Sequence, residues 1–269
     1  MPELPEMETY ENLLVRKISG KTITDVTVNR EKSINTSVSD FINRVKNQEI
    51  TAIDRRAKHL LFYLKSGDVL LLHLMLGGLM FYGTEEEKLD RTVQIQLSFG
   101  KHYLYFIGLR LGYLHLLSLG EVEQVLTDLG PEPLDEQFTR EVFLDVSKNK
   151  RGRLKTTLVD QEFLSGIGNR YSDEIAWHAQ IMPARKMNEL DEQGMNRLYD
   201  SIRFVLQQAI KYGGYMEQPL YHGDTLTGGY GTRMYVYDRE GDPCSRCGTL
   251  ITKGEMSSRK VFFCGKCQF

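Results

Sequence analysis

Long hydrophobic runs are absent from this sequence of 269 residues. Apolar stretches such as Val69–Leu72 are far shorter than the roughly 18 residues that a membrane-spanning helix needs. The first residues, Met1–Glu6, also lack the basic start and apolar stretch of a secretory signal peptide. The sequence therefore argues against a membrane or secreted protein, and we expect a cytoplasmic one.

Net charge is small as well, at −2 from 34 basic and 36 acidic side chains. A near-neutral chain lacks the overall positive charge of many nucleic-acid-binding proteins. The cations are clustered, however, with five of them and no acid in residues 148–155 and a second excess after Cys244. These two basic segments are compatible with a local phosphate-binding face.

Hydrophobic periodicity divides the chain into two parts. Apolar residues recur at helical spacing over 3–19, and residues 21–118 then show the alternation and glycine breaks of short strands. We predict an α+β protein in which residues 1–130 form an N-terminal helix and a β-sandwich domain. The proline-containing segment 131–135 follows as a linker.

The C-terminal part is predicted to be mostly helical. Its helices are expected at about 136–147, 151–161, 169–178 and 189–212. A stretch rich in Gly, Thr and Tyr at 215–233 is typical of a loop. Residues 136–233 thus form a helical domain, and residues 234–269 contain short strands and every cysteine of the chain.

Cysteine is scarce, and its few positions are informative. The four residues form two Cys-x2-Cys pairs, namely Cys244, Cys247, Cys264 and Cys267. This is the spacing of a four-thiolate zinc ribbon, and disulfides, the alternative, do not suit a cytosolic chain. Four sulfur ligands leave no open position, so we predict one structural Zn²⁺ ion that holds a hairpin. Arg259 lies in that hairpin, where a phosphate contact and a solvated charge are equally compatible with the spacing.

The N-terminus offers a second chemical group. Methionine before a small residue is usually removed, and Pro2 would then carry a free secondary amine. Because the pKa of an α-amine is about 8, a useful fraction of this amine is unprotonated at neutral pH. It could then attack an aldehyde carbon and form an iminium ion. Glu3 and Glu6 would lie beside it in the first turn of the predicted helix. A simple Pro-Glu helix start is the other interpretation.

Five motifs, spread in order over nearly the whole chain, resemble those of the formamidopyrimidine-DNA glycosylase family. They are the opening Pro2–Glu6, the lysine-bearing strand turn 55–60 with the His-Leu pair 73–74, the interdomain Leu-Gly-Pro-Glu-Pro-Leu at 129–134, the helix-two-turn-helix segment 164–174, and the zinc hairpin ending in Cys267-Gln268. The resemblance implies a bifunctional glycosylase and abasic-site lyase of base excision repair whose partner is damaged double-stranded DNA.

The resemblance also implies roles for single residues. Pro2 would attack C1′ of the damaged nucleotide, expel the base and leave an iminium link, and Glu3 would transfer protons to and from the opened sugar. Lys58 would act as a cation near the sugar-phosphate, although a lysine at a strand end is by itself more often a surface residue. β- and then δ-elimination would cleave the strand. Arg259 completes the predicted catalytic set.

The target nucleotide must leave the duplex, which requires a phosphate clamp. The glycine-rich turn before Asn169 would bind phosphate at the start of a helix, and the loop 215–233 falls at the family's damaged-base recognition loop. The other expected DNA contacts are Glu6, His73, Lys150, Arg153, Lys155, Tyr237 and Arg259. A helix cap at Asn169 and a solvated helix face for the cations are the alternatives.

One segment departs from the family. The methionine, arginine and phenylalanine that fill the space of the flipped base align here with Leu76, Leu109 and Leu111. Leucine can wedge between bases, but it cannot hydrogen-bond an orphaned cytosine. We therefore predict little preference for cytosine opposite the lesion. Arg110 could serve after a one-residue shift, although strand alternation would point it to the other face.

This departure leaves two alternatives open. One is an endonuclease VIII-like preference for oxidised pyrimidines, and the other is a lesion- or branch-binding protein of the same fold with reduced or lost glycosylase activity. Retention of Pro2 favours the enzyme, because binding alone does not need an N-terminal proline. A generic zinc-ribbon module would leave residues 1–230 unexplained. No coiled coil is evident, and we expect a monomer.

Overall fold

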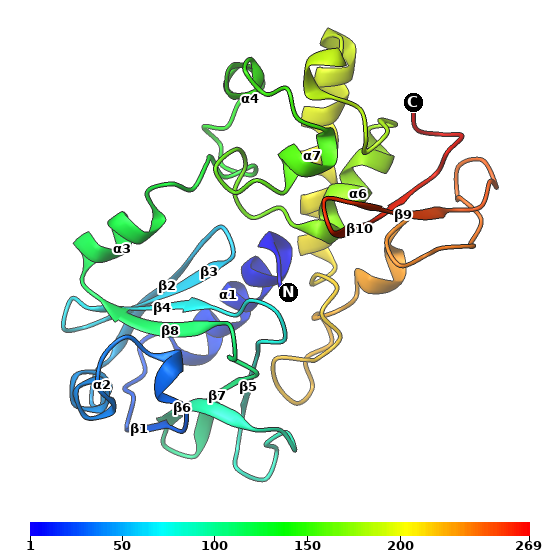
Figure 1. Ribbon diagram of the computed structural model, residues 1–269. Helices are drawn as coiled ribbons and strands as arrows, with labels where there is room; N and C mark the ends of the chain where they lie inside the picture. Colours follow the sequence, from blue (N-terminus) through cyan, green and yellow to red (C-terminus); the bar gives the residue numbers. More distant parts are fainter. The chain divides into compact units, whose positions relative to one another are not determined.

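The computed structural model describes residues 1–269, and the chain folds into two compact units. The first unit contains Met1–Thr127 and Tyr212–Gly229, and the second contains Asp128–Lys211 and Tyr230–Phe269. Most helices and all strands of the two units are labelled in Figure 1. Residues 212–229 thus pack in the first unit, although they follow the last long helix of the second.

The predicted N-terminal helix is α1 (Leu4–Ile18). Glu3 is its N-cap residue, Glu6 completes a capping box, and Pro5 lies in the first turn, where the missing N–H has no helical partner to lose. Met7, Tyr10 and Leu14 bury one face of the helix in the core of the first unit. This apolar stripe packs α1 against the sandwich, next to β2 and β3.

Two antiparallel four-stranded sheets form the predicted β-sandwich. One has the order β1-β6-β7-β5 and the other β2-β3-β4-β8. The strands are β1 (Asp25–Val28), β2 (Ile50–Arg56), β3 (His59–Leu64), β4 (Val69–His73), β5 (Leu79–Gly83), β6 (Val93–Phe99), β7 (His102–Ile107) and β8 (Tyr113–Leu117). Their inner faces share one hydrophobic core, in which the rings of Phe62 and Phe106 meet edge to face at 6.5 Å.

Three short elements of the first unit were not expected from the sequence, which indicated only strands between residues 21 and 118 and no further helix before about residue 136. They are the 3-10 helix η1 (Glu31–Ser33) and the helices α2 (Val38–Val45) and α3 (Leu119–Leu126). In α2 only Phe41 and Val45 are buried, so the apolar pattern is too brief to indicate a helix. In α3, Val122 covers the outer face of the second sheet.

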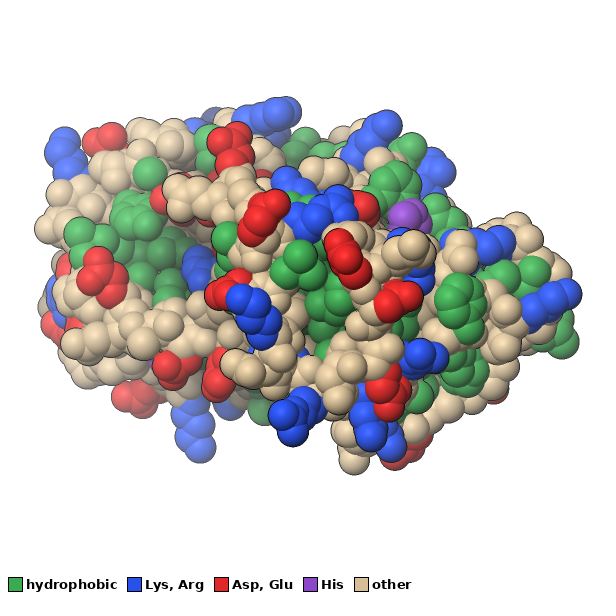
Figure 2. Space-filling model, turned by 90° about the horizontal axis from the view of Figure 1, so that it is seen from above, with side chains coloured by type: hydrophobic (Ala, Val, Ile, Leu, Met, Phe, Trp, Pro, Cys, Tyr) green, Lys and Arg blue, Asp and Glu red, His purple; other side chains and the backbone are tan.

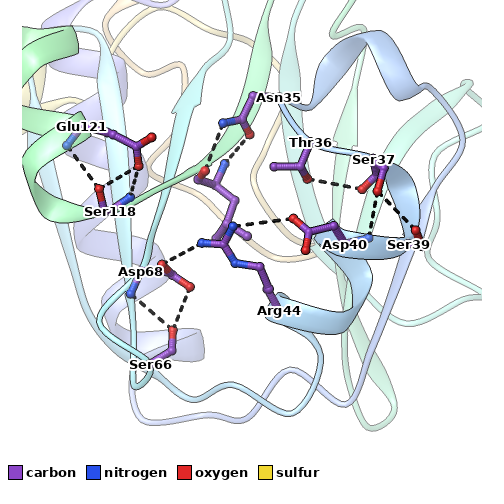
Figure 3. A network of polar contacts seen from close by, with 11 residues as sticks. Asn35, Thr36, Ser37, Ser39, Asp40, Arg44, Ser66, Asp68, Ser118 and Glu121 are labelled. Atoms are coloured by element: carbon purple, nitrogen blue, oxygen red, sulfur yellow. Dashed lines mark hydrogen bonds and ion pairs between the residues drawn. The ribbon is translucent and has the colours of Figure 1, made fainter.

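Polar contacts attach α2 and the segment before it to the sheet β2-β3-β4-β8 (Figure 3). Arg44 lies between Asp40 of the same helix, at 3.6 Å, and Asp68 of the β3–β4 turn, at 2.9 Å. The Asn35 amide donates to the carbonyl of Leu116 at 3.0 Å and accepts from its N–H at 2.8 Å. Asn35 thereby satisfies backbone groups of β8, which is an edge strand.

The second unit is helical with a C-terminal hairpin. Its helices are α4 (Arg140–Ser147), α5 (Leu154–Leu158), α6 (Asn169–His178) and α7 (Glu192–Lys211). Two 3-10 turns are also present, η2 (Met187–Glu189) and η3 (Gly231–Arg233). The hairpin consists of β9 (Thr252–Met256), which pairs antiparallel with β10 (Arg259–Phe263). The prediction for α6 is confirmed, whereas α4 begins later than expected because Thr139 caps it. None of the helices has the length and apolar character that crossing a bilayer requires.

Candidate functional site

The first turn of α1 is enclosed by the fold. Pro2 is buried, and Glu3 is only 2% exposed. The Glu3 N–H donates to Oε2 of Glu6 at 2.8 Å, and Oε1 of Glu6 accepts the N–H of Tyr215 at 2.9 Å. The Tyr215 hydroxyl in turn donates to the carbonyl of Met1. The Pro2 segment is therefore held from two sides, by its own helix and by the chain that follows α7.

Glu6 is not available as the DNA contact that the sequence suggested. Its side chain is 1% exposed, and both carboxylate oxygens accept backbone N–H groups. A carboxylate in this position cannot approach a phosphate without losing those bonds. The Glu6 side chain also leaves room only for glycine at position 214, since a Cβ built there would lie 2.3 Å from Oε1 of Glu6. The sequence signalled Gly214 only as a helix end.

Lys58 lies in the tight turn between β2 and β3, which Ala57 permits by adopting a positive φ of 53°. The Lys58 side chain is mostly buried, with 6% exposed. The neighbouring Arg55 donates through Nε to a carboxylate oxygen of Glu8 in α1 at 2.6 Å. This partly buried ion pair joins the turn carrying Lys58 to the helix whose first turn follows Pro2.

An aromatic row crosses three strands next to this turn. His59 of β3 pairs with His73 of β4, which pairs with Tyr113 of β8. The two imidazole centroids are 4.2 Å apart, and the Tyr113 hydroxyl lies 3.3 Å from Nε2 of His59. His73 was predicted from the sequence, but His59 and Tyr113 were missed because only the register brings them together.

Both imidazoles of the row are neutral at physiological pH. Burial lowers the pKa of His59 to about 4 and the pKa of His73 to about 3, and the adjacent Lys58 charge acts in the same direction. Nε2 of His73 has no hydrogen-bond partner. This nitrogen is buried, and a neutral imidazole can donate one hydrogen bond.

Lowering the pH from 7 to 5 is expected to destabilise the protein through this pair. The unfolded chain binds these protons near pH 6.5 and the folded chain only near pH 4 or below, so stability falls as the pH drops through this window. Each histidine contributes at most about 2 kcal/mol at pH 5. Urea unfolding at both pH values measures the loss.

The variants His59→Phe and His73→Phe should flatten this pH dependence, and His102→Gln, at an exposed position, serves as the matched control. An unchanged pH slope in the double variant would show that the two rings do not carry the effect.

Lys155 of α5 is buried in the second unit rather than presented to solvent. Its Nζ donates to Oδ1 of Asp173 at 2.7 Å and to the carbonyl of Asn169 at 2.6 Å, and its side chain is 1% exposed. Oδ2 of Asp173 accepts the N–H of Phe262 in β10 at 3.0 Å. The expectation of a phosphate contact at Lys155 is therefore wrong, because Asp173 already neutralises its charge inside the fold. The Lys155 side chain instead holds the start of α6.

Asn169 is the first residue of α6, and Gly168 is the N-cap residue. The Asn169 side chain therefore does not cap the helix; its Nδ2 donates to the Tyr237 hydroxyl at 3.2 Å and to the Lys260 carbonyl at 3.1 Å. Its Oδ1 is buried without a partner. Tyr237 is half-buried beneath the Arg170 guanidinium, 4.6 Å from the ring centroid, so it supports Asn169 and has little free surface of its own.

Glu174 is a structural residue that the sequence marked only as part of a motif. It is fully buried, and its carboxylate accepts the backbone N–H groups of Tyr235, Val236 and Tyr237 at 2.7–2.9 Å. Burial raises its pKa, while the three N–H donors favour the charged form. Together with Asp173, it attaches α6 to both segments that surround the cysteines.

Exposed cations remain on the second unit after these assignments. Arg153 at the start of α5 and Arg259 at the start of β10 are exposed and make no ion pair. Lys150 pairs with Asp160 at 3.2 Å but keeps a third of its side chain exposed. On the face shown in Figure 2, basic and acidic side chains are interspersed. Arg153, Lys150 and Arg259 are the predicted phosphate contacts that solvent can reach here.

The four cysteines converge as their spacing predicted. Their sulfur atoms all lie within 4.8 Å of one another, and two of the pairs are 3.5 and 4.0 Å apart. A tetrahedral zinc ion with bonds of about 2.3 Å needs sulfur separations of about 3.8 Å, so the site fits this metal. The Trp177 indole donates to Sγ of Cys244 at 3.4 Å, a contact that orients the ligand.

The three leucines that replace the family's intercalating residues differ in exposure. Leu76 and Leu111 are 67% and 62% exposed, whereas Leu109 is fully buried. The Leu109 N–H donates to Gln94 and its carbonyl accepts from Ser33, so this side chain cannot reach a base. Of the three, Leu76 and Leu111 alone present their side chains to solvent.

Arg110 lies where the sequence argument did not expect it. It lines a cavity of about 590 Å³ together with Leu76, Leu111 and Arg91. The argument from strand alternation fails because β7 ends at Ile107 and β8 begins at Tyr113, so residue 110 belongs to a turn. Arg110 is therefore on the same side as the two exposed leucines.

Comparison with known proteins agrees with this geometry. Residues 1–113 match the model of the formamidopyrimidine-DNA glycosylase N-terminal domain, residues 129–218 match its H2TH domain, and residues 241–268 match the zinc finger found in FPG and IleRS. The formamidopyrimidine-DNA glycosylases of Ligilactobacillus salivarius and Streptococcus pneumoniae are each 34% identical over 272 residues, covering 100% of this chain and 99% of theirs. The chain belongs to the formamidopyrimidine-DNA glycosylase family.

Solved structures of this family share the fold. A Lactococcus lactis FPG mutant bound to Fapy-dG-containing DNA superimposes with a TM-score of 0.92 at 31% identity, and the complex of the L. lactis protein with abasic-site DNA gives 0.92 at 30%; each comparison covers 99% of both chains. As a member of the formamidopyrimidine-DNA glycosylase family, the chain is a DNA glycosylase of base excision repair. Its four cysteines hold one structural zinc ion.

Proposed function

We propose that this chain is a bifunctional enzyme that removes an oxidised base with Pro2 as the nucleophile and then cleaves the strand at the abasic site. The enclosure of the Pro2 segment carries the proposal. Both the residue and the adjacent Glu3 are buried, and Glu6 and Tyr215 hold the backbone on either side. Positioning a nucleophile beside a carboxylate in this way suits attack on a sugar carbon.

The proposed sequence of bonds starts once Met1 has been removed. The nitrogen of Pro2 forms a bond to C1′ as the bond from C1′ to the base breaks, the base leaves, and the nitrogen gives up its proton. The bond from C1′ to O4′ then breaks, O4′ takes up a proton, and the opened sugar stays joined to Pro2 as an iminium ion. Glu3 exchanges protons with the sugar, and the Lys58 cation offsets negative charge on the phosphates. Loss of a C2′ proton then releases the 3′ phosphate, and a second elimination releases the 5′ phosphate.

The proposed partner is double-stranded DNA that carries a damaged base or an abasic site, bound by one copy of the chain. In the similar structures, the L. lactis protein is bound to DNA that contains Fapy-dG or an abasic site. In this chain we propose His73, Asn169, Lys150, Arg153 and Arg259 as phosphate contacts. Residues 1–130 would carry the chemistry, and residues 136–233 and 234–269 would bind DNA. The loop 215–233 would recognise the damaged base.

A borohydride trap tests the proposed function. Duplexes with an abasic site, 8-oxoguanine or an oxidised pyrimidine are incubated with the protein and reductant, and the fraction of covalent adduct is measured. An adduct identifies an iminium intermediate, and the duplex that traps best identifies the substrate. Tight binding to the same duplexes without any adduct would instead favour a damage-binding protein.

The base opposite the lesion is expected to matter little. Leu109 is buried where the family has its reading arginine, and a lost bidentate base contact typically removes about 1–3 kcal/mol of discrimination. Single-turnover cleavage of duplexes with each of the four opposite bases provides the measurement. A tenfold preference for cytosine would contradict the prediction, and its loss in Arg110→Ala would then assign the contact to Arg110.

A further inference from the structure

We propose that Asp224 is a positioning residue for base excision, which gives the segment 213–229 a fixed shape before DNA binds. This inference rests on the proposed function, because it assigns the segment to recognition of the damaged base. From composition alone the segment is a glycine-rich loop without helix or strand. In the structure it has its own polar centre and two attachments to the rest of the first unit.

The Asp224 carboxylate is the polar centre of the loop. Oδ1 accepts the N–H groups of Leu226 at 3.0 Å and Thr227 at 3.2 Å, and Oδ2 accepts the N–H of Leu220 at 2.9 Å and the Thr227 hydroxyl at 2.6 Å. The residue is 8% exposed, and its four donors hold its pKa below the ordinary value although burial opposes them. One ionised side chain therefore defines the backbone on both sides of position 224.

The first attachment joins the loop to the sandwich. Leu220 is fully buried in the main core, and its carbonyl accepts the N–H of Tyr82 in β5 at 2.6 Å. Next to it, the ring of Tyr221 lies 3.9 Å from the ammonium group of Lys17 in α1. Because the Leu220 N–H binds Asp224, the carboxylate connects the loop to a residue that cannot move without disturbing the core.

The second attachment joins the loop to the catalytic segment. The N–H of Gly228 donates to the carbonyl of Gly213 at 3.0 Å and closes the base of the loop, and a Cβ at Gly213 would lie 2.0 Å from the carbonyl oxygen of Leu226. Two residues further, Tyr215 donates to Glu6, which also accepts the Glu3 N–H. None of these contacts uses the Asp224 carboxylate, so the residues beside Pro2 keep their partners when that carboxylate is lost.

A fixed loop matters for one of the two reactions. Excision requires the enzyme to hold an extrahelical base in a defined orientation, and misplacing recognition groups by about 1 Å can cost about 100-fold in rate. Cleavage at an abasic site involves no base. Loss of the Asp224 contacts should therefore slow excision and leave abasic-site cleavage nearly unchanged, whereas general misfolding would slow both.

The test compares single-turnover rates on two duplexes, one with the oxidised base that the borohydride trap identifies as the substrate and one with a preformed abasic site. We expect Asp224→Asn to lower the excision rate at least about tenfold and abasic cleavage less than about twofold. Asp90→Asn, which removes an exposed carboxylate of the same unit that makes no hydrogen bond, is the matched control and should change neither rate.

Two variants at the neighbouring donor keep the test independent of folding problems. Thr227→Val removes only the hydroxyl bond to Asp224 and should slow excision less than Asp224→Asn does. Thr227→Ser keeps the hydroxyl and should excise the base at close to the wild-type rate. Equal slowing of both reactions, or no slowing of excision, would overturn the positioning role. A wild-type chain that cleaves neither duplex would refute the proposed function itself, and the inference with it.

Amide hydrogen exchange provides a readout that does not depend on activity. In the free wild-type protein the amides of Leu220, Leu226 and Thr227 should be protected, and in Asp224→Asn the latter two should exchange at least about tenfold faster. Rapid exchange of these amides in the wild type would show that the loop has no fixed shape before DNA binds, and the proposal would be wrong.

Discussion

Replacing Pro2 with leucine is expected to reduce the borohydride-trapped adduct on abasic DNA at least about 100-fold, while the affinity for the same DNA changes less than about threefold. The variant loses the secondary amine and also keeps Met1, because methionine before a bulky residue is not removed. No unprotonated amine then remains beside Glu3. Adduct yield after a fixed time, with binding measured in parallel, gives both numbers.

Pro2→Gly is the graded companion of this variant. Glycine still allows removal of Met1 and leaves a primary amine, which forms an imine but lacks the ring that restricts the nucleophile, so we expect an intermediate loss of about tenfold. An unchanged adduct in Pro2→Leu would mean that another amine attacks the sugar. Lys58, in the turn tied to α1 through Arg55 and Glu8, would then be the nucleophile to test.

Loss of a zinc ligand is the second change with a large expected effect. Structural zinc sites of this type contribute apparent binding free energies on the order of 10–16 kcal/mol to folding in isolated fingers. Cys247→Ser is therefore expected to abolish the stoichiometric zinc and to unfold the β9–β10 hairpin. DNA affinity should fall at least about tenfold, because Arg259 lies on β10 and Asn169 and Asp173 bind the Lys260 carbonyl and the Phe262 N–H.

The matched control for the zinc prediction keeps a ligand at the same position. Cys247→His offers an imidazole nitrogen, which zinc accepts in many four-coordinate sites, so it should retain the metal and most of the DNA affinity. Metal content by elemental analysis, the melting temperature and DNA binding are measured for the three proteins. Full DNA affinity in metal-free Cys247→Ser would contradict the structural role of the hairpin.

Several features could be predicted because they depend on local chemistry. Cys244 and Cys247 face one ion because a two-residue spacing on a tight turn brings both sulfurs to the same side of the chain. Periodicity located α1, since one face of this helix is apolar over several turns. The β-sandwich followed from alternation along its strands, which packing in two layers requires.

Charged residues show where sequence reasoning stopped. Both Lys155 and Glu6 were expected to meet DNA, and for Lys155 the reason was that its charge suits a phosphate clamp. Both are buried, each with partners far away in the chain: Asp173 for Lys155 and the N–H of Tyr215 for Glu6. A local pattern records a charge but not the partner that neutralises it, so only the fold decides which cations remain for a ligand.

The sequence by itself determined the family, the zinc ligands and the chemical groups that the reaction needs, since these depend on residue types at fixed spacing. Tertiary structure alone decided which groups act together. It aligned His59, His73 and Tyr113 through strand register, buried Leu109 while exposing Leu76 and Leu111, and placed Asp224 at the centre of a loop. The physical reason is that register, burial and hydrogen-bond partners arise from contacts between residues distant in the chain.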